Sequence, residues 1–178
     1  MSTRGCIARL IDRERGQFKG VFHHWDSYPS GLGKTLFDLR RTRFGGSTKD
    51  MLKVLIDDHP AGWENINGVD WNLKPGYYYK DDFPGQGNPR CMRPQCRCHG
   101  EQGCPPDEFT EENADAEYVY AFTENDSKML ILCPYLKDVF KVQRTFGVEP
   151  WDRLILAEID LNGDEPNWQA LNPEELRG

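Results

Sequence analysis

Five side chains of the kinds that bind zinc lie within one short segment of the chain: Cys91, Cys96, Cys98, His99 and Cys104. Zinc prefers four thiolate or imidazole ligands arranged as a tetrahedron. Because Cys98 and His99 are adjacent, their side chains point apart. The expected ligand set is therefore the four cysteines of the segment, or the same set with His99 in place of Cys98. Four protein ligands leave no open coordination position, so the predicted ion is structural. Free thiols, disulfides and an iron-sulfur cluster are the alternatives.

A second group of reactive side chains begins at His23. Residues two apart on a strand share a face, so His24 and Asp26 are expected to approach each other while His23 and Trp25 face the other way. A carboxylate beside an imidazole fixes the tautomer that a general base or a metal ligand needs. With Tyr28 or Ser2 completing the site, these residues are candidates for the catalytic centre of a small hydrolase. The alternative is a core-capping turn, in which Asp26 accepts backbone N–H bonds and Trp25 packs.

The tripeptide Gly33-Lys34-Thr35 follows an expected strand and precedes an expected helix. Lysine and threonine at that place handle phosphate and magnesium in a P-loop. The first glycine of that motif would fall at position 28, where this chain has tyrosine. Nucleotide binding through this tripeptide is a further hypothesis.

The start of the chain offers another kind of nucleophile. Removal of Met1 would leave Ser2 with a free amine, so that one residue could act as nucleophile and base together. Ser2, a strand pair, and then Asp26 and Gly33 resemble the opening of the N-terminal-nucleophile hydrolases, the proteasome-like and bile-salt-hydrolase-like groups among them. Over the first 35 residues this resemblance implies a hydrolase in which Ser2 is the nucleophile and Asp26 supports it.

Four segments together resemble a family of uncharacterised bacterial and phage proteins. They are residues 3–5 (Thr-Arg-Gly), the His-Trp-Asp-x-Tyr-Pro loop within 22–36, residues 96–100, and the Tyr-rich residues 117–120. Ser27 stands where members of that family have glycine. The resemblance covers most of the chain and implies a shared fold and a phage or mobile-element origin, without assigning an activity.

The elements expected to position these side chains are hairpins near both ends of the chain with helices between them. Alternating apolar patterns predict strands in three places, namely a hairpin over 3–25, a hairpin over 117–133 and a single strand over 153–161. Apolar periodicity predicts a helix over 34–44 and another that begins with Ser47 as its N-cap and ends before Pro60. The segment 135–146 fits either a helix or a strand.

The predicted fold class is α+β, with an antiparallel sheet, helices packed on one face and a long zinc-ordered loop. Residues 61–116 are rich in Gly, Pro, Asn and Asp, and a loop of that length needs something to order it. A bound zinc ion would contribute on the order of 10 kcal/mol to that ordering. We expect a single domain over residues 1–161 with a Cys-rich insert at 85–106, followed by an acidic tail, 162–178, on the surface.

The charge pattern limits the partners. A net charge of -7 and a pI near 5.1 argue against nucleic acid, because proteins that bind it cluster Lys and Arg to displace counterions. The basic cluster of Lys34, Arg40, Arg41 and Arg43 is expected to be a solvated helix face, with a phosphate site as the alternative. The chain contains no apolar run of the roughly 18 residues that a membrane span requires and opens without the apolar stretch of a signal peptide, which predicts a cytoplasmic location away from membranes.

These observations predict a zinc-stabilised accessory or interaction protein that binds another macromolecule, with a protein as its partner. A small hydrolase and a nucleotide-binding protein are the alternatives.

Overall fold

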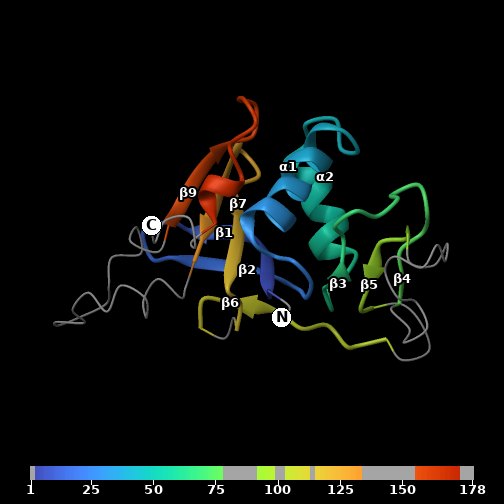
Figure 1. Cartoon of the computed structure of the whole chain (residues 1–178). Helices are drawn as coiled ribbons and strands as arrows, with labels where there is room; N and C mark the ends of the chain where they lie inside the picture. Colours follow the sequence, from blue (N-terminus) through green and yellow to red (C-terminus); the bar gives the residue numbers. More distant parts are fainter. Residues whose placement is uncertain (1–2, 78–91, 99–102, 113–114, 134–154, 173–178) are drawn as a thin grey trace.

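The computed structural model describes residues 3–77, 92–98, 103–112, 115–133 and 155–172 of the 178-residue chain (Figure 1). Its strands are β1 (Gly5–Asp12), β2 (Gln17–His23), β3 (Trp63–Asn65), β4 (Gly76–Tyr77), β5 (Gln95–Cys96), β6 (Phe109–Thr110), β7 (Tyr118–Phe122), β8 (Lys128–Leu132) and β9 (Ile155–Asp160). Its helices are α1 (Lys34–Arg41) and α2 (Thr48–Leu52). A π-helical turn, η1 (Pro29–Gly33), leads into α1, another, η2 (Lys53–Asp57), follows α2, and a 3-10 turn, η5 (Gln169–Leu171), lies near the end.

The strands form one mixed sheet. In the described residues its order is β4-β5-β3-β2-β1-β7-β8-β9, and β6 pairs with β2. β1 pairs with β7 in parallel, with Gly5 opposite Tyr118, and β2 pairs in parallel with β3 where His23 lies opposite Trp63. The α+β class is confirmed, but the expectation of an antiparallel sheet is wrong. Hairpin patterns fix only the pairing inside each hairpin, and here the two hairpins join through the parallel pair β1 and β7.

Both predicted hairpins are present. β1 and β2 pair from Gly5 opposite His23 onward, and β7 pairs with β8 in antiparallel register. β9, within the predicted strand 153–161, pairs with β8. Successive side chains of these strands alternate between two faces, so that Ile7 and Tyr120 lie in one buried cluster while Ala8 lies in the other.

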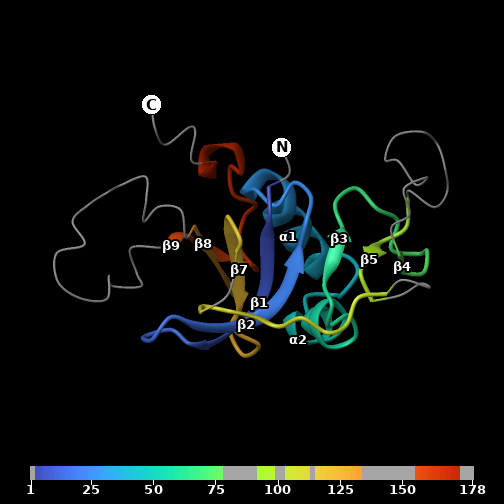
Figure 2. The same cartoon turned by 90° about the horizontal axis from the view of Figure 1, so that it is seen from below.

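The helices α1 and α2 pack on the sheet face that carries Ile7 and Tyr120 (Figures 1 and 2). Phe37 of α1 and Leu52 of α2 belong to the same buried cluster as those two strand residues. The second helix begins where the sequence predicts, because the Ser47 side chain accepts the backbone N–H of Asp50 at 3.1 Å. This cap satisfies a donor that would otherwise have no partner in the first turn.

The segment after β9 does not lie wholly on the surface, so the expectation for the acidic tail is wrong at Trp168. That side chain is 5 % exposed and meets the ring of Phe37 edge-on, with 5.6 Å between the ring centroids. Its indole N–H donates to Glu165, which also accepts from Lys34. The large apolar area of one indole outweighs the polarity of its acidic neighbours and ties the segment to α1.

Two arginines of α1 hold the same segment. Arg40 is buried and donates to the Asn162 side-chain oxygen at 3.0 Å, as well as to the Thr48 hydroxyl of α2 at 2.7 Å. Arg41 donates to the carbonyl oxygens of Leu161 and Gly163. Burial lowers the pKa of Arg40, and the neighbouring charge of Arg41 lowers it further. The expectation of a solvated basic face is therefore wrong for Arg40, whose donors are used to join elements of the fold.

The segment 135–146, which fits a helix or a strand by its pattern, lies outside the described residues. Across the described part of the chain, every helix is too short or too polar to cross a bilayer.

Candidate functional site

The loop after β2 continues the pairing of that strand with β3. The backbone N–H groups of His24 and Trp25 donate to the carbonyl oxygens of Trp63 and Glu64, at 3.1 and 3.2 Å. Both residues are therefore held at the end of the sheet, with their side chains positioned by backbone bonds on β3.

Ser27 ties the same loop to β1 and β7. Its backbone N–H donates to the carbonyl of Thr3 at 3.0 Å, and its own carbonyl accepts the buried Tyr120 hydroxyl at 2.6 Å. The loop crosses β1 so closely that a Cβ at Gly5 would lie 2.6 Å from the Ser27 Cβ, which only glycine avoids. Three strands thus fix the loop, and it carries its side chains on a rigid base.

Asp26 turns the chain out of the strand conformation. Its φ of 51° is left-handed, and among the described non-glycine residues no other φ is positive. The Asp26 carbonyl accepts from Leu32 N at 3.0 Å and from the side-chain amide of Asn67 at 3.1 Å, and Asn67 also donates to the carbonyl of Trp25. Strand alternation therefore stops before Asp26, and the carboxylate that contacts His24 comes from a different strand.

His23 and Ser27 form a buried pair that resembles a base and a nucleophile, but the hydrogen bonds of the pair give it a structural role. His23 Nε2 accepts the backbone N–H of Ile66 at 3.1 Å, so the ring hydrogen is on Nδ1, which donates to Ser27 Oγ at 2.8 Å. The Ser27 hydroxyl in turn donates to the His23 carbonyl at 3.2 Å. Burial, with a smaller contribution from His24, lowers the pKa of His23 to about 3. The imidazole has no lone pair left with which to activate Ser27.

The side chains that reach solvent at this place are Phe22, His24, Trp25, Glu64 and Arg97, which we call the Trp25 surface. His24 Nδ1 lies 2.8 Å from one Glu64 oxygen, and Arg97 Nε lies 3.4 Å from the other. The Trp25 indole stacks on the His24 ring, with an 8° interplanar angle and 4.6 Å between centroids, and is 39 % exposed. The Arg97 guanidinium lies 5.0 Å from the centre of the Phe22 ring.

This arrangement has two chemical capacities. An exposed indole backed by charged groups is suited to contact with another macromolecule. An imidazole whose Nδ1 hydrogen is held by a carboxylate keeps a lone pair on Nε2, which is suited to general-base work.

Sequence reasoning missed Glu64 and Arg97. Glu64 lies 40 residues from His24 in the chain and reaches it only because β3 pairs with the end of β2. The position of Arg97 between two candidate ligand cysteines was a signal that could have drawn attention to it. Its carboxylate partner, Glu64, could not be predicted, because Glu64 is placed by the same pairing of β2 with β3.

Three of the five candidate zinc ligands lie among the described residues. Cys96 is buried on β5, while Cys98 and Cys104 are half-buried. The Cys98 sulfur accepts the backbone N–H of Ala61 at 3.1 Å, and Cys104 N donates to the carbonyl of Arg97 at 2.7 Å, which brings Cys104 back beside residues 96–98. In the ranges that the structure describes, no three His, Cys, Asp or Glu side chains form a group that could hold a metal ion.

The remaining candidate site residues either lie outside the described part of the chain or contact the core. Cys91, His99 and Ser2 lie outside the described residues. Tyr28 is half-buried against the main core, at the start of η1.

The P-loop-like tripeptide adopts a different geometry from a phosphate loop. Its backbone continues a helix, and the Lys34 N–H bonds the carbonyl oxygens of Gly31 and Pro29 in place of facing a ligand. The Lys34 ammonium pairs with Asp38 and Glu165, at 3.0 and 2.7 Å.

The chain was compared with models of known protein families, with curated proteins and with solved structures, and none of the three comparisons gave a match.

Proposed function

We propose that this protein acts by binding a protein partner through the Trp25 surface, and that a structural zinc ion in the Cys-rich segment keeps that surface in place. The observation that carries the proposal is Trp25, a large apolar side chain that is 39 % exposed on a loop held by backbone bonds to β3 and to Thr3 and by the Tyr120 hydroxyl of β7. Tryptophan and arginine are enriched among the few residues that carry most of the binding energy in protein interfaces.

The rigidity of the loop supports the same conclusion. Ordering a side chain and its loop on binding costs about 0.5–1.5 kcal/mol for each immobilised group, and a surface that is already ordered avoids this cost. Trp25 is stacked on His24 and its backbone is bonded to Glu64 and Asn67, so little freedom remains to be lost when a partner binds.

The zinc part of the proposal rests on the position of Arg97. This residue lies between Cys96 and Cys98 and contacts Glu64 and Phe22 in the Trp25 surface. The hydrogen bond that the backbone N–H of Ala61 donates to the Cys98 sulfur is of the kind that stabilises a thiolate ligand.

The proposed ligands are Cys91, Cys96 and Cys104 with Cys98 or His99 as the fourth. Ordering this segment around the ion would hold Arg97 against Glu64.

The partner is tested by photo-crosslinking. The chain carries a photoreactive phenylalanine analogue at position 25, or at the exposed position 126 as a control, and crosslinks are compared in extracts of the source cells. A partner that crosslinks from position 25 is then purified and titrated against the unmodified chain, Trp25→Ala and Asp126→Ala. Asp126 is the control, because it is an exposed residue outside the Trp25 surface. We expect Trp25→Ala to weaken binding by 10-fold or more, a loss of about 1.4 kcal/mol or more, while Asp126→Ala has little effect. Equal affinities for all three proteins would overturn the proposal.

The zinc ion is tested by metal analysis of the purified chain and by its melting temperature before and after chelation. We expect about one zinc per chain and a lower melting temperature once the ion is removed. If the purified chain contains no metal and chelation leaves the melting temperature unchanged, the zinc part of the proposal is wrong. The Trp25 surface is tested separately by the crosslinking and binding experiment.

A second candidate function is hydrolysis with His24 as general base. The observation that favours it is the 2.8 Å contact between His24 Nδ1 and Glu64, which leaves Nε2 to take a proton from a water molecule. Glu64 is in turn held by Arg97, so the imidazole is oriented by a carboxylate that is itself fixed.

A panel of activated esters and amides tests this candidate. His24→Gln should abolish any turnover that the chain shows, Glu64→Gln should reduce it, and neither should change the melting temperature by more than a few degrees, because both side chains are partly exposed. Turnover that survives in His24→Gln would exclude His24 as the base.

A further inference from the structure

The aromatic side chains of the Trp25 surface continue into a row of four rings on the face of β2 that points away from the helices, which we call the aromatic strip. The Trp25 indole stacks on the His24 ring with 4.6 Å between their centroids, and the His24 centroid lies 5.8 Å from that of Phe22. The Phe22 ring stacks on Phe109 of β6, with 5.7 Å between centroids. Trp25 is 39 % exposed and the other three residues are half-buried, so each residue of the strip presents some surface to solvent.

Two hydrogen-bond donors accompany the aromatic strip. The indole N–H of Trp25 has no acceptor among the described residues. The Arg97 guanidinium lies 5.0 Å from the centre of the Phe22 ring and contacts Glu64 through Nε, at 3.4 Å. Within the described part of the chain its terminal nitrogens donate to no acceptor, so they remain available to a ligand. The strip therefore combines apolar ring surface with donors that can reach the carbonyl oxygens of a bound chain.

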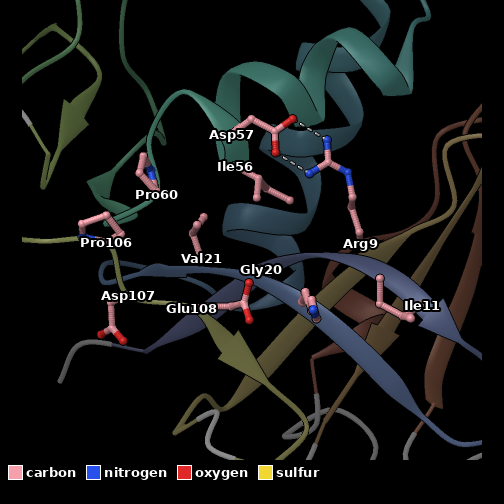
Figure 3. A pocket seen from close by; sticks show the side chains of 11 residues that line it. Arg9, Ile11, Gly20, Val21, Ile56, Asp57, Pro60, Pro106, Asp107 and Glu108 are labelled. Carbon is pink, nitrogen blue, oxygen red and sulfur yellow. Dashed lines mark hydrogen bonds and ion pairs between the residues drawn. The ribbon is translucent and has the colours of Figure 1, made fainter.

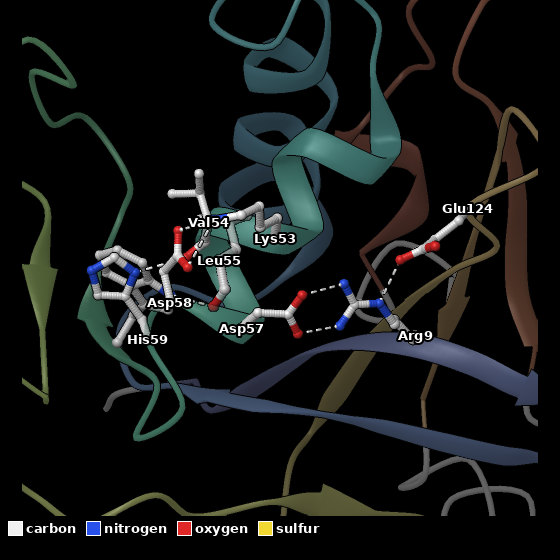
Figure 4. A network of polar contacts seen from close by, with 9 residues as sticks. Arg9, Lys53, Val54, Leu55, Asp57, Asp58, His59 and Glu124 are labelled. Atoms are coloured by element: carbon white, nitrogen blue, oxygen red, sulfur yellow. Dashed lines mark hydrogen bonds and ion pairs between the residues drawn. The ribbon is translucent and has the colours of Figure 1, made fainter.

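The opposite face of β2 carries a different surface, a hollow between the sheet and the end of η2 (Figure 3). Val21 and Phe22 are successive residues of one strand, so their side chains point to opposite faces, and Val21 lines the hollow. Arg9 in the same lining already donates from both terminal nitrogens to Asp57 and from Nε to Glu124 (Figure 4). Among the described residues no aromatic ring lines this hollow, which makes it an internal reference for binding at the strip.

The backbone and the charges around the aromatic strip restrict the kind of peptide that it can bind. A peptide added as a further strand needs an unpaired strand edge, but His24 and Trp25 already donate to β3, and β6 pairs with β2 at Gly20. An acidic or phosphorylated segment needs a cluster of arginines, whereas Arg97 stands beside the carboxylate of Glu64. A polyproline II segment needs neither feature, because it docks on aromatic side chains and its backbone carbonyls have no internal hydrogen bonds.

We propose that the aromatic strip binds a proline-rich segment of the partner in the polyproline II conformation. Its pyrrolidine rings pack along the strip, and its carbonyl oxygens accept from the Trp25 indole and from Arg97. This inference rests on the proposed function, since it specifies the chemistry of the partner that contacts the Trp25 surface. Polyproline II is already extended in the free chain, so little conformational freedom is lost on binding.

Single-stranded nucleic acid is the other ligand whose rings stack on aromatic side chains. Its phosphates require basic residues, and the strip lies on a chain with a net charge of -7 where Arg97 is already beside a carboxylate. The charge therefore favours an uncharged proline-rich chain.

The test is a titration of the isotope-labelled full chain with acetylated and amidated octaproline, followed by the nuclear magnetic resonance signals of the indole N–H groups. A Gly-Ser peptide of the same length and an octathymidylate are the comparison probes. We expect octaproline to move the Trp25 indole signal saturably to lower field, because this N–H gains a carbonyl acceptor. The signals of Trp63 and Trp168 should stay in place, since these indoles already donate to Leu55 and Glu165.

Three variants separate the parts of the interaction. Trp25→Phe keeps a ring and removes the donor, so it should weaken octaproline binding roughly 2- to 10-fold, the usual contribution of one hydrogen bond. Phe109→Leu keeps apolar bulk and removes an aromatic face, and it should also weaken binding. Ile11→Ala changes an exposed apolar residue of the hollow on the other face and should leave the affinity unchanged. The remaining indole and backbone signals report whether each variant is folded.

The inference is overturned if octaproline binds no more tightly than the Gly-Ser peptide, if octathymidylate binds more tightly than octaproline, or if Trp25→Phe and Phe109→Leu both leave the affinity unchanged. If octaproline fails to bind while Trp25→Ala weakens binding of the purified partner, this inference is wrong and the proposed function stands. If octaproline binds the strip but the partner binds Trp25→Ala as tightly as the unmodified chain, the proposed function is wrong and the preference of the strip for proline-rich chains stands.

Discussion

Acidification from pH 7 to pH 5 should destabilise this protein through His23. Its pKa is about 3 in the folded protein, against 6.5 for the unperturbed side chain, so the unfolded chain takes up a proton over a range where the folded protein does not. Stability from this residue is fully present above pH 6.5 and is lost as the pH falls toward 3. At 1.36 kcal/mol per pH unit, the loss in unfolding free energy between pH 7 and pH 5 is about 2 kcal/mol.

Urea denaturation at a series of pH values measures this loss, and His23→Gln isolates it. A glutamine oxygen can still accept the Ile66 N–H, but glutamine does not titrate, so the variant should lose little stability between pH 7 and pH 5. His24→Gln is the matched control and should keep most of the loss, because its ring is partly exposed and the Ile66 bond is untouched. If His23→Gln loses as much stability as the unmodified protein, His23 is not held neutral and the structural assignment of the His23 and Ser27 pair is wrong.

Three further substitutions test the fold that positions the site. Ser47→Ala should lower the unfolding free energy by about 1 kcal/mol in urea titrations, while Ser47→Asn, which keeps a capping oxygen, should change it little. Trp168→Ala should cost about 3–5 kcal/mol because the indole is buried, whereas Trp25→Ala at the exposed indole should cost far less; equal losses would mean that the C-terminal segment is not docked. Gly20→Ala should leave little folded protein by circular dichroism, because its Cβ would meet the Ile7 carbonyl and lie 2.6 Å from the Ala8 Cα; a stable variant would contradict the β1 and β2 register.

The local features of the fold could be predicted because short stretches of sequence decide them. The hairpin over 3–25 is visible in its loose apolar alternation, and the Ser47 cap depends on a residue only three positions away. The start of α1 and its buried Leu36 and Phe37 follow from helical periodicity in the same way.

The composition of the site could not be predicted because its partners are distant in the chain. His24 meets Glu64, and not Asp26, because Asp26 adopts a left-handed φ and β3 supplies the nearer carboxylate. The local strand pattern carries neither fact. Arg40 likewise looks like a surface cation in the sequence and becomes buried only because the segment after β9 packs against α1.

By itself the sequence determined the two hairpins, the strand β9, the two helices with their buried side chains, and the segments that concentrate reactive residues, since these depend on spacing within a single element. The short strands β3, β4, β5 and β6 lie within residues 61–116, which the sequence predicts as a loop, because each of them forms only by pairing with a strand elsewhere in the chain. Only the tertiary structure decided that the two hairpins join in parallel, that Trp25 stays exposed while Trp168 is buried, and that His23 is neutral while His24 is paired with Glu64. Burial and charge pairing depend on every element that packs around a side chain, so they become fixed only when those elements come together.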